Sequence, residues 1–213
     1  MKKNIKQLTA LALILGMTGA GTTMAYGSAT IPAVTTRVVT GEDSGVETTL
    51  NGTIKATTLS VTIPLTAAFD IDPTKYSATD PNIQVGGNQS SGYKIVNNSA
   101  VPVYVYISGV SVPTSGVTLV DTVAGLDTNK ALMLAISEKP TAAASDISNT
   151  GFWLKTSMTG KYYMDTTQAN KGNLDANGGT MNLKIYGMTQ KGWSNADTFA
   201  VKPSFTVTVT EPT

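Results

Sequence analysis

The stretch YKIVNNSAVPVYVYISGV, residues Tyr93–Val110, joins two runs rich in β-branched and aromatic residues through an Asn-Asn-Ser step. In the second run valine or isoleucine alternates with tyrosine or another residue, which is typical of a β-strand with one buried face. The short polar side chains of the step hydrogen-bond to nearby backbone and tolerate turns, while Pro102 suits the start or edge of a strand. The stretch therefore predicts a strand, a polar corner and a second strand.

The same alternation recurs along the chain in KATTLSVTIP from Lys55, MNLKIYGM from Met181 and SFTVTVT from Ser204. In the last of these runs Phe205, Val207 and Val209 are expected to face the core. KALMLAIS is apolar on both faces and fits a central strand or a short helix, and KPTAAASDIS is the best helical candidate. Turn residues separate the runs. We predict an all-β protein with a single antiparallel β-sandwich, Ig-like or jelly-roll-like.

The N-terminus has the pattern of a secretory signal peptide, which we assign to residues 1–25. Three lysines precede the apolar run LTALALILGM, and small residues follow it. A run of about ten apolar residues is half of what a membrane span needs. We expect cleavage after Ala25, with Ala29 as the alternative, and a secreted protein at the cell surface without a membrane span.

Composition argues against several functions. The chain has 15 basic and 14 acidic residues, and loss of the three leader lysines leaves 12 against 14, a net charge of −2. We therefore expect no nucleic-acid partner. The chain has no histidine and no cysteine, so the commonest general base, a common nucleophile and the usual zinc ligands are missing. We expect no enzyme; Asp70, Asp72 and Asp165 are the acids on which a distant catalytic alternative would depend.

Residues 26–50 form a Thr-rich segment, called the N-terminal arm below, before a β-sandwich domain at 51–213. The arm contains many β-branched but few large apolar residues. Such a segment can add as a strand to the open sheet edge of a neighbouring copy, with Ile31, Val34, Val38 and Val39 as the inserted side chains. Repetition of that contact would give a filament. Two alternatives stay open: the first strand of the same domain, or a disordered leader.

The stretch YKIVNNSAVPVYVYI, preceded by LSVTIPLTAAFDIDP, also resembles a known group of proteins. It is similar to the pattern V-x-N-x-(S/G)-x-x-P-V-x-V of small secreted Firmicute β-sandwich surface proteins that include the TasA/camelysin-like biofilm fibre subunits. The resemblance covers about residues 54–109. It implies a fibre subunit of the biofilm matrix of a Gram-positive-type cell. A camelysin-type metal site cannot be carried over, because the chain has no histidine.

Two acidic segments are candidates for binding a hard cation. NLDANGG, with Asp175 and Asn177, resembles the start of a Ca²⁺ loop, but Lys184 stands where a bidentate Glu is required. We favour a polar hairpin turn there. Asp70 and Asp72 in FDIDP can bind a cation or can simply end a strand before a proline.

Aromatic residues are the candidates for contact with a partner. Tyr104 and Tyr106 alternate with the valines of their strand, and Trp153 stands in TGFWLK. Such rings can stack on sugars, contact another subunit or pack internally. Trp193 is a weaker candidate in a turn. We therefore predict a non-catalytic structural subunit that self-associates into filaments; the alternative is a module or adhesin that binds cell-wall or host glycans through exposed aromatics.

Overall fold

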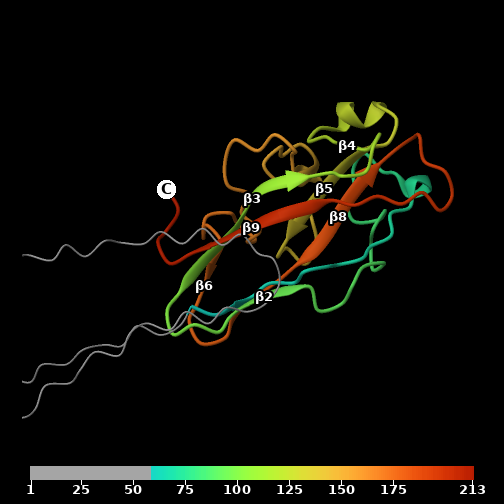
Figure 1. Cartoon of the computed structure of the whole chain (residues 1–213). Helices are drawn as coiled ribbons and strands as arrows, with labels where there is room; N and C mark the ends of the chain where they lie inside the picture. Colours follow the sequence, from blue (N-terminus) through green and yellow to red (C-terminus); the bar gives the residue numbers. More distant parts are fainter. Residues whose placement is uncertain (1–58) are drawn as a thin grey trace, which may run out of the picture. The chain divides into compact units, whose positions relative to one another are not determined.

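The computed structural model describes residues 59–213, which contain nine β-strands and no α-helix (Figure 1). The strands are β1 Val61–Thr62, β2 Lys94–Asn97, β3 Val103–Ser111, β4 Thr118–Leu119, β5 Ala131–Ser137, β6 Asn173–Leu174, β7 Gly179–Asn182, β8 Lys184–Thr189 and β9 Lys202–Thr208. Three short 3₁₀ helices lie in the connections: η1 Pro73–Lys75, η2 Val123–Asp127 and η3 Ala144–Ile147. The predicted all-β class is confirmed. The expected signal peptide and the N-terminal arm lie outside the described residues.

The strands form three small sheets, ordered β1-β2-β7, β6-β3-β9 and β4-β5-β8. One buried cluster of valine, isoleucine, leucine and methionine side chains draws on all three sheets. Every strand pair is antiparallel except β4 with β5. The prediction of a purely antiparallel arrangement is therefore wrong at this pair. The connection that contains η2 returns the chain to the end of the sheet at which β4 begins, so that β5 can run parallel to β4.

The predicted polar corner between β2 and β3 is a buried hydrogen-bonding centre. The Asn97 side chain is fully buried, and its amide nitrogen lies 2.9 Å from the carbonyl oxygens of Val101 and Asp175 and 3.2 Å from that of Leu174. Its amide oxygen accepts the backbone N–H of Ser99. The corner thus links the two strands to the β6–β7 connection.

Two predicted runs differ from the observed elements. MNLKIYGM contains the end of β7 and most of β8, which belong to different sheets and are separated at Leu183. KPTAAASDIS contains only the single turn η3. KALMLAIS is the strand β5, buried along its whole length, so its two apolar faces do mark a central strand.

The last strand is less deeply buried than its pattern predicts. Phe205 and Val207 pack against the core but remain half-exposed. Val209 is 58% exposed, so the prediction that it faces the core is wrong. The physical reason is that the ladder between β9 and β3 ends at Thr208, one residue before Val209.

Candidate functional site

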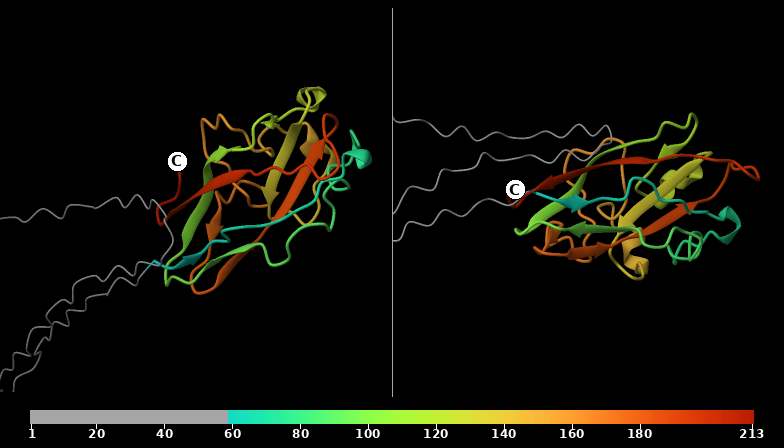
Figure 2. Two further views of the ribbon diagram at one scale, coloured as in Figure 1. Left: turned by 45° about the vertical axis from the view of Figure 1, so that its right-hand side comes forward. Right: turned by 60° about the horizontal axis from the view of Figure 1, so that its bottom comes forward.

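Two sheet edges lie near each other along one side of the described domain. β9 pairs with β3 only, and β1 pairs with β2 only. In both views of Figure 2 the segment that carries β1 runs between β9 and β2. Within residues 59–213 no strand pairing joins this segment to β9. Beyond β1, Phe69 of the same segment forms an isolated bridge with Gln89. The opposite edge of the segment therefore faces β9 and has no strand pairing with it.

Half-buried apolar side chains line this side of the core. They come from the segment after Leu59 and from the chain leading into and along β9: Val61, Ile63, Ala67, Phe69, Ile71, Phe199, Val201, Phe205 and Val207. The rings of Phe69 and Phe199 meet edge to face with centroids 5.6 Å apart. We call this side, with the edges of β1 and β9, the open seam. The described residues therefore cover the core incompletely along the seam.

The backbone of β9 presents hydrogen-bonding groups to the open seam. In β3 the N–H groups of Val105 and Ile107 donate to carbonyls on the side away from β9, at 2.8 and 3.0 Å. Directly opposed residues in an antiparallel pair exchange both hydrogen bonds or neither. The β9 partners of these residues, Val207 and Phe205, therefore direct their N–H and C=O groups away from β3.

Pro203 limits the length of this edge. It stands within β9 opposite Val110, and alternation places its nitrogen on the same side as those of Phe205 and Val207. A proline has no N–H, and within a sheet it is tolerated at an edge strand. Because its nitrogen offers no donor, the part of β9 that can pair with a further strand begins at about Phe205.

The edge of β8 is closed by two glutamine side chains. The amide of Gln84 accepts the N–H of Thr189 at 2.8 Å and donates to its C=O at 2.9 Å. Gln89 does the same for Ile185, at 2.7 and 3.1 Å. Each side-chain amide replaces one residue of a neighbouring strand. Neither residue was predicted from the sequence, because Gln84 and Gln89 flank the turn residues VGGN and a glutamine in a loop is ordinarily solvated.

A tyrosine closes a third set of backbone groups. The hydroxyl of Tyr162 accepts the N–H of Ile136 at 3.2 Å and lies 2.9 and 2.8 Å from the carbonyls of Ile136 and Phe152. Burial raises the pKa of Tyr162 well above its usual value. Side chains of the domain itself therefore satisfy outward-facing backbone groups of both β5 and β8.

Tyr104 and Tyr106 lie on the face of β3 opposite the buried valines, as predicted, and both are half-exposed. The rings of Tyr106 and Tyr163 meet edge to face with centroids 6.1 Å apart. The ammonium of Lys161 lies 6.0 Å from the centroid of Tyr106. Beside them the ammonium of Lys171 forms an ion pair with the carboxylate of Glu211, and this pairing raises the pKa of Lys171. The two tyrosines thus belong to a mixed aromatic and charged surface.

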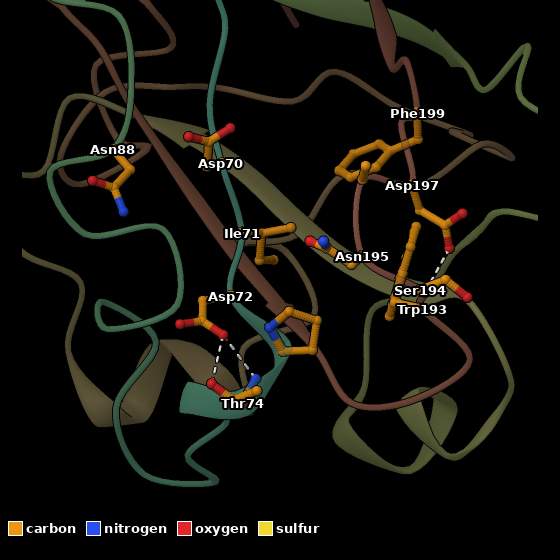
Figure 3. A pocket seen from close by; sticks show the side chains of 12 residues that line it. Asp70, Ile71, Asp72, Thr74, Asn88, Trp193, Ser194, Asn195, Asp197 and Phe199 are labelled. Carbon is orange, nitrogen blue, oxygen red and sulfur yellow. Dashed lines mark hydrogen bonds between the residues drawn. The ribbon is translucent and has the colours of Figure 1, made fainter.

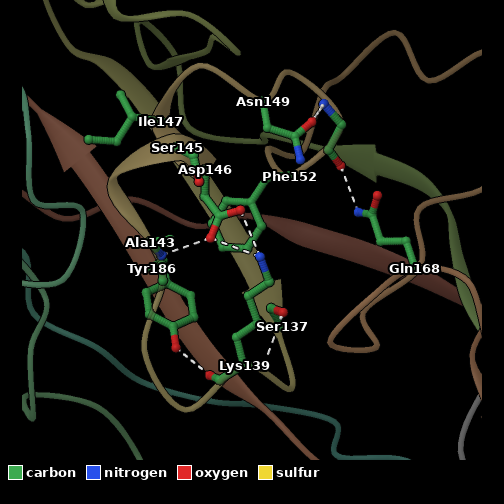
Figure 4. Close-up of polar contacts among 12 residues, drawn as sticks. Ser137, Lys139, Ala143, Ser145, Asp146, Ile147, Asn149, Phe152, Gln168 and Tyr186 are labelled. Carbon is green, nitrogen blue, oxygen red and sulfur yellow. Dashed lines mark hydrogen bonds and ion pairs between the residues drawn. The ribbon is translucent and has the colours of Figure 1, made fainter.

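Trp153 is not exposed, and its prediction as a surface contact residue is wrong. Only 1% of it is accessible, its indole N–H donates to the carbonyl of Asp146 at 3.0 Å, and its ring packs edge to face on Phe152. The carboxylate of Asp146 pairs with Lys139 at 2.7 Å (Figure 4). Trp153 is buried because η3 supplies a carbonyl acceptor for its only polar group.

Asp70 and Asp72 both line a cleft beside η1 (Figure 3). The hydroxyl and backbone N–H of Thr74 donate to Asp72 at 2.6 and 3.0 Å, and these bonds lower the pKa of Asp72. Asp72 is thus the N-cap of η1. Asp70 is exposed. Across residues 59–213 no group of three or more acidic side chains is placed to hold a metal ion.

The candidate Ca²⁺ segment forms a tight turn. Asn177 has a positive φ of 58° and donates its N–H to the carbonyl of Ser99 at 2.8 Å. A Cβ on Gly179 would lie 2.2 Å from the carbonyl oxygen of Asp175. That oxygen already accepts the amide of Asn97. The segment is a polar turn that docks on the polar corner, as predicted, but it is not a hairpin, because β6 and β7 belong to different sheets.

Asp165 is buried in the loop before β6. One of its carboxylate oxygens accepts the N–H of Gly172 at 2.7 Å, and the other has no hydrogen-bond partner among the described residues. Burial, and secondly the charge of Asp165, raise the pKa of Glu138. The hydrogen bond from Gly172 to Asp165 holds the loop at a point where it lies very close to β3. A Cβ on Gly172 would lie only 1.9 Å from the carbonyl oxygen of Val105, so only glycine fits there.

The proposed insertion residues Ile31, Val34, Val38 and Val39 lie outside the described residues. Of the helices in the described part of the chain, none is long and apolar enough to cross a bilayer. No family model matches the chain, and no curated protein or solved structure matches it.

Proposed function

We propose that this chain is a non-catalytic, exported structural protein of a bacterial cell surface or matrix, and that it assembles into fibres by strand addition. In this proposal the described domain is a β-sandwich whose open seam receives the N-terminal arm of the next copy. The observation that carries the proposal is the edge of β9, where Phe205 and Val207 direct backbone groups away from β3. An unpaired edge over half-covered apolar side chains is a template for a further strand.

The arm has two faces that an added strand could bury. Alternation puts Val34 and Val38 on one face and Ile31 and Val39 on the other. One pair would enter the core and the other would face solvent. Each buried valine or isoleucine contributes about 1.5–3 kcal/mol, and each ladder hydrogen bond about 0.5–1.5 kcal/mol. These terms oppose an ordering cost of about 1–2 kcal/mol for each arm residue that becomes fixed.

Pairing between copies gives a filament for a geometric reason. The arm and the seam are different surfaces, so the contact is heterologous and does not close on itself. If the arm paired with the seam of its own domain, the same contacts would give a monomer. In the filament, the surface of β3 that carries Tyr104 and Tyr106 would remain available for lateral contacts between fibres.

The test compares the mature chain, which begins after Ala25, with a version that begins at Gly52. Negative-stain electron microscopy and light scattering measure assembly, and far-UV circular dichroism measures retained β-structure. We expect filaments from the mature chain and folded monomers from the shortened one. Monodisperse monomers in both samples would sink the proposal.

A sharper version changes the arm without removing it. Replacing Val34 and Val38 together with aspartate, and separately Ile31 and Val39, keeps arm length and added charge equal between the two variants. Because only one face enters the core, we expect one variant to lose filaments and the other to keep them. Equal assembly by both would show that the arm does not insert as a strand.

A further inference from the structure

A cleft of about 460 Å³ lies between the segment Asp70–Thr74 and the loop Trp193–Phe199 (Figure 3). Its volume is in the range of about 300–1,000 Å³ that small-ligand sites occupy. In the sequence Trp193 is only a weak candidate for a contact residue, because it stands among turn residues. The fold brings it opposite Asp70, which is more than a hundred positions earlier in the chain.

Trp193 supplies a fixed aromatic wall to this cleft. Its indole N–H donates to the hydroxyl of Thr189 at 2.6 Å, and Thr189 is itself held by Gln84. The ring packs on Phe199, with centroids 5.4 Å apart. Trp193 and Phe199 are both half-exposed. The indole is therefore held in place while part of its surface remains open to a ligand.

Three side chains of the cleft have polar groups available for a ligand. Among residues 59–213, no hydrogen bond or ion pair engages the side chains of Asp70, Asn88 or Asn195. Figure 3 shows all three as part of the cleft lining. All three are exposed, so their carboxylate and amide groups exchange water for ligand at little cost.

The other two acids of the cleft, Asp72 and Asp197, already form hydrogen bonds within the protein. Asp72 caps η1, and Asp197 accepts the N–H of Ser194 at 2.8 Å and pairs with Lys130 at 3.0 Å. These contacts lower the pKa of Asp197, chiefly through the Ser194 bond. Asp197 thereby holds the loop that carries Trp193. The cleft thus combines positioned walls with unengaged polar side chains.

We propose that this cleft binds a saccharide, with the indole of Trp193 against the apolar face of a pyranose ring and with Asp70, Asn88 and Asn195 hydrogen-bonded to ring hydroxyls. An aromatic ring buries the C–H face of a sugar, and planar carboxylate and amide groups accept from or donate to neighbouring hydroxyls. The acidic lining disfavours phosphate or carboxylate ligands. The cleft adjoins the open seam and shares Ile71 and Phe199 with it, but Trp193 and the three polar side chains are not part of the seam.

The full chain contains two tryptophans, so the test can observe them separately. The indole N–H resonances of the ¹⁵N-labelled version that begins at Gly52, which should be a folded monomer, are recorded while maltotriose, cellotriose, xylotriose or chitotriose is added. The Trp193 resonance is assigned with Trp193→Phe. We expect it to shift saturably with at least one trisaccharide, at a Kd of about 1 mM as suits one aromatic and a few hydrogen bonds. The resonance of buried Trp153 should stay in place.

Substitutions in the cleft then test the polar contacts. Asp70→Ala and Asn195→Ala should each weaken binding about tenfold, since each loses a hydrogen bond in a partly desolvated site. The matched control is Asp121→Ala, an acid that pairs with Lys155 and does not line the cleft; it should bind as the parent does. No shift of Trp193 with any of the four sugars overturns the proposal. Equal affinities for the Asp70 and Asp121 variants overturn it as well.

Discussion

The strands β8 and β9 both end their sheets, but only one of these edges is closed. At β8 the side-chain amides of Gln84 and Gln89 pair with the backbone as a neighbouring strand would. At β9 the residues facing away from β3 have no strand partner among residues 59–213. An unpaired edge is a hazard that proteins ordinarily cover. Since the domain covers one edge and leaves the other, the difference supports a use for the open one.

The strongest test of this comparison places proline at two adjacent positions of β9. Val207→Pro removes a donor from the open edge, whereas Thr206→Pro removes a donor that pairs with Tyr106 of β3. We expect Thr206→Pro to cost about 3 kcal/mol or more of folding free energy. Val207→Pro should fold, with a smaller loss, and should abolish filaments. Urea unfolding and electron microscopy measure the two effects.

The outcome of this pair is informative in either direction. Wild-type filaments from Val207→Pro would contradict strand addition at β9. Equal stability losses for the two variants would contradict the assignment of N–H directions along this strand.

The closed edge is broken most severely by Gln84→Ala. Gln84 is 2% exposed, and its loss leaves the N–H and C=O of Thr189 buried without partners. We expect the free energy of unfolding to fall by about 2–4 kcal/mol, since two unsatisfied groups cost about 1–3 kcal/mol each. Chemical denaturation checks this. Gln190→Ala is the control: this half-buried neighbour makes none of these bonds, and the change should stay within about 0.5 kcal/mol.

A smaller effect is expected from Gln89→Ala. Its hydrogen bonds to Ile185 are only partly buried, so water can replace them, and a loss of about 1–2 kcal/mol is expected. Hydrogen exchange should show the amide of Ile185 opening faster while that of Thr189 keeps its protection. Unchanged exchange at Ile185 would argue against a glutamine-closed edge.

The smallest effect at neutral pH concerns Tyr93, which packs partly buried against the core. Burial raises the pKa of Tyr93 to about 12, above its value of about 10 in an unfolded chain. The unfolded state therefore loses this proton first, so the stabilisation is complete below pH 10 and declines as the pH rises toward 12. Tyr93→Phe should be nearly neutral at pH 7 and should flatten the loss of stability above pH 10. Thermal melts from pH 7 to 11 measure this.

Local pattern predicted much of the domain. The alternation from Val103 to Ile107 depends only on neighbouring residues, and it correctly gave the strand and its buried face. The Asn-Asn-Ser corner was predictable for the same reason, because Asn97 and Ser99 bond to nearby backbone. The candidate site was predicted less well. Trp153 was the stronger surface candidate and Trp193 the weaker one, but Trp153 is buried against η3 and Trp193 lines a cleft.

By itself the sequence determined the all-β class and the positions of most strands, because periodicity and turn chemistry act over a few residues. Only the tertiary structure decided which edges are closed. Gln84 closes β8 from 105 positions away, and the cleft likewise joins Asp70 to Trp193. Such contacts depend on how the strands are ordered in space. No local pattern of residues carries that information, so exposure, edge coverage and the shape of the sites emerged only from packing.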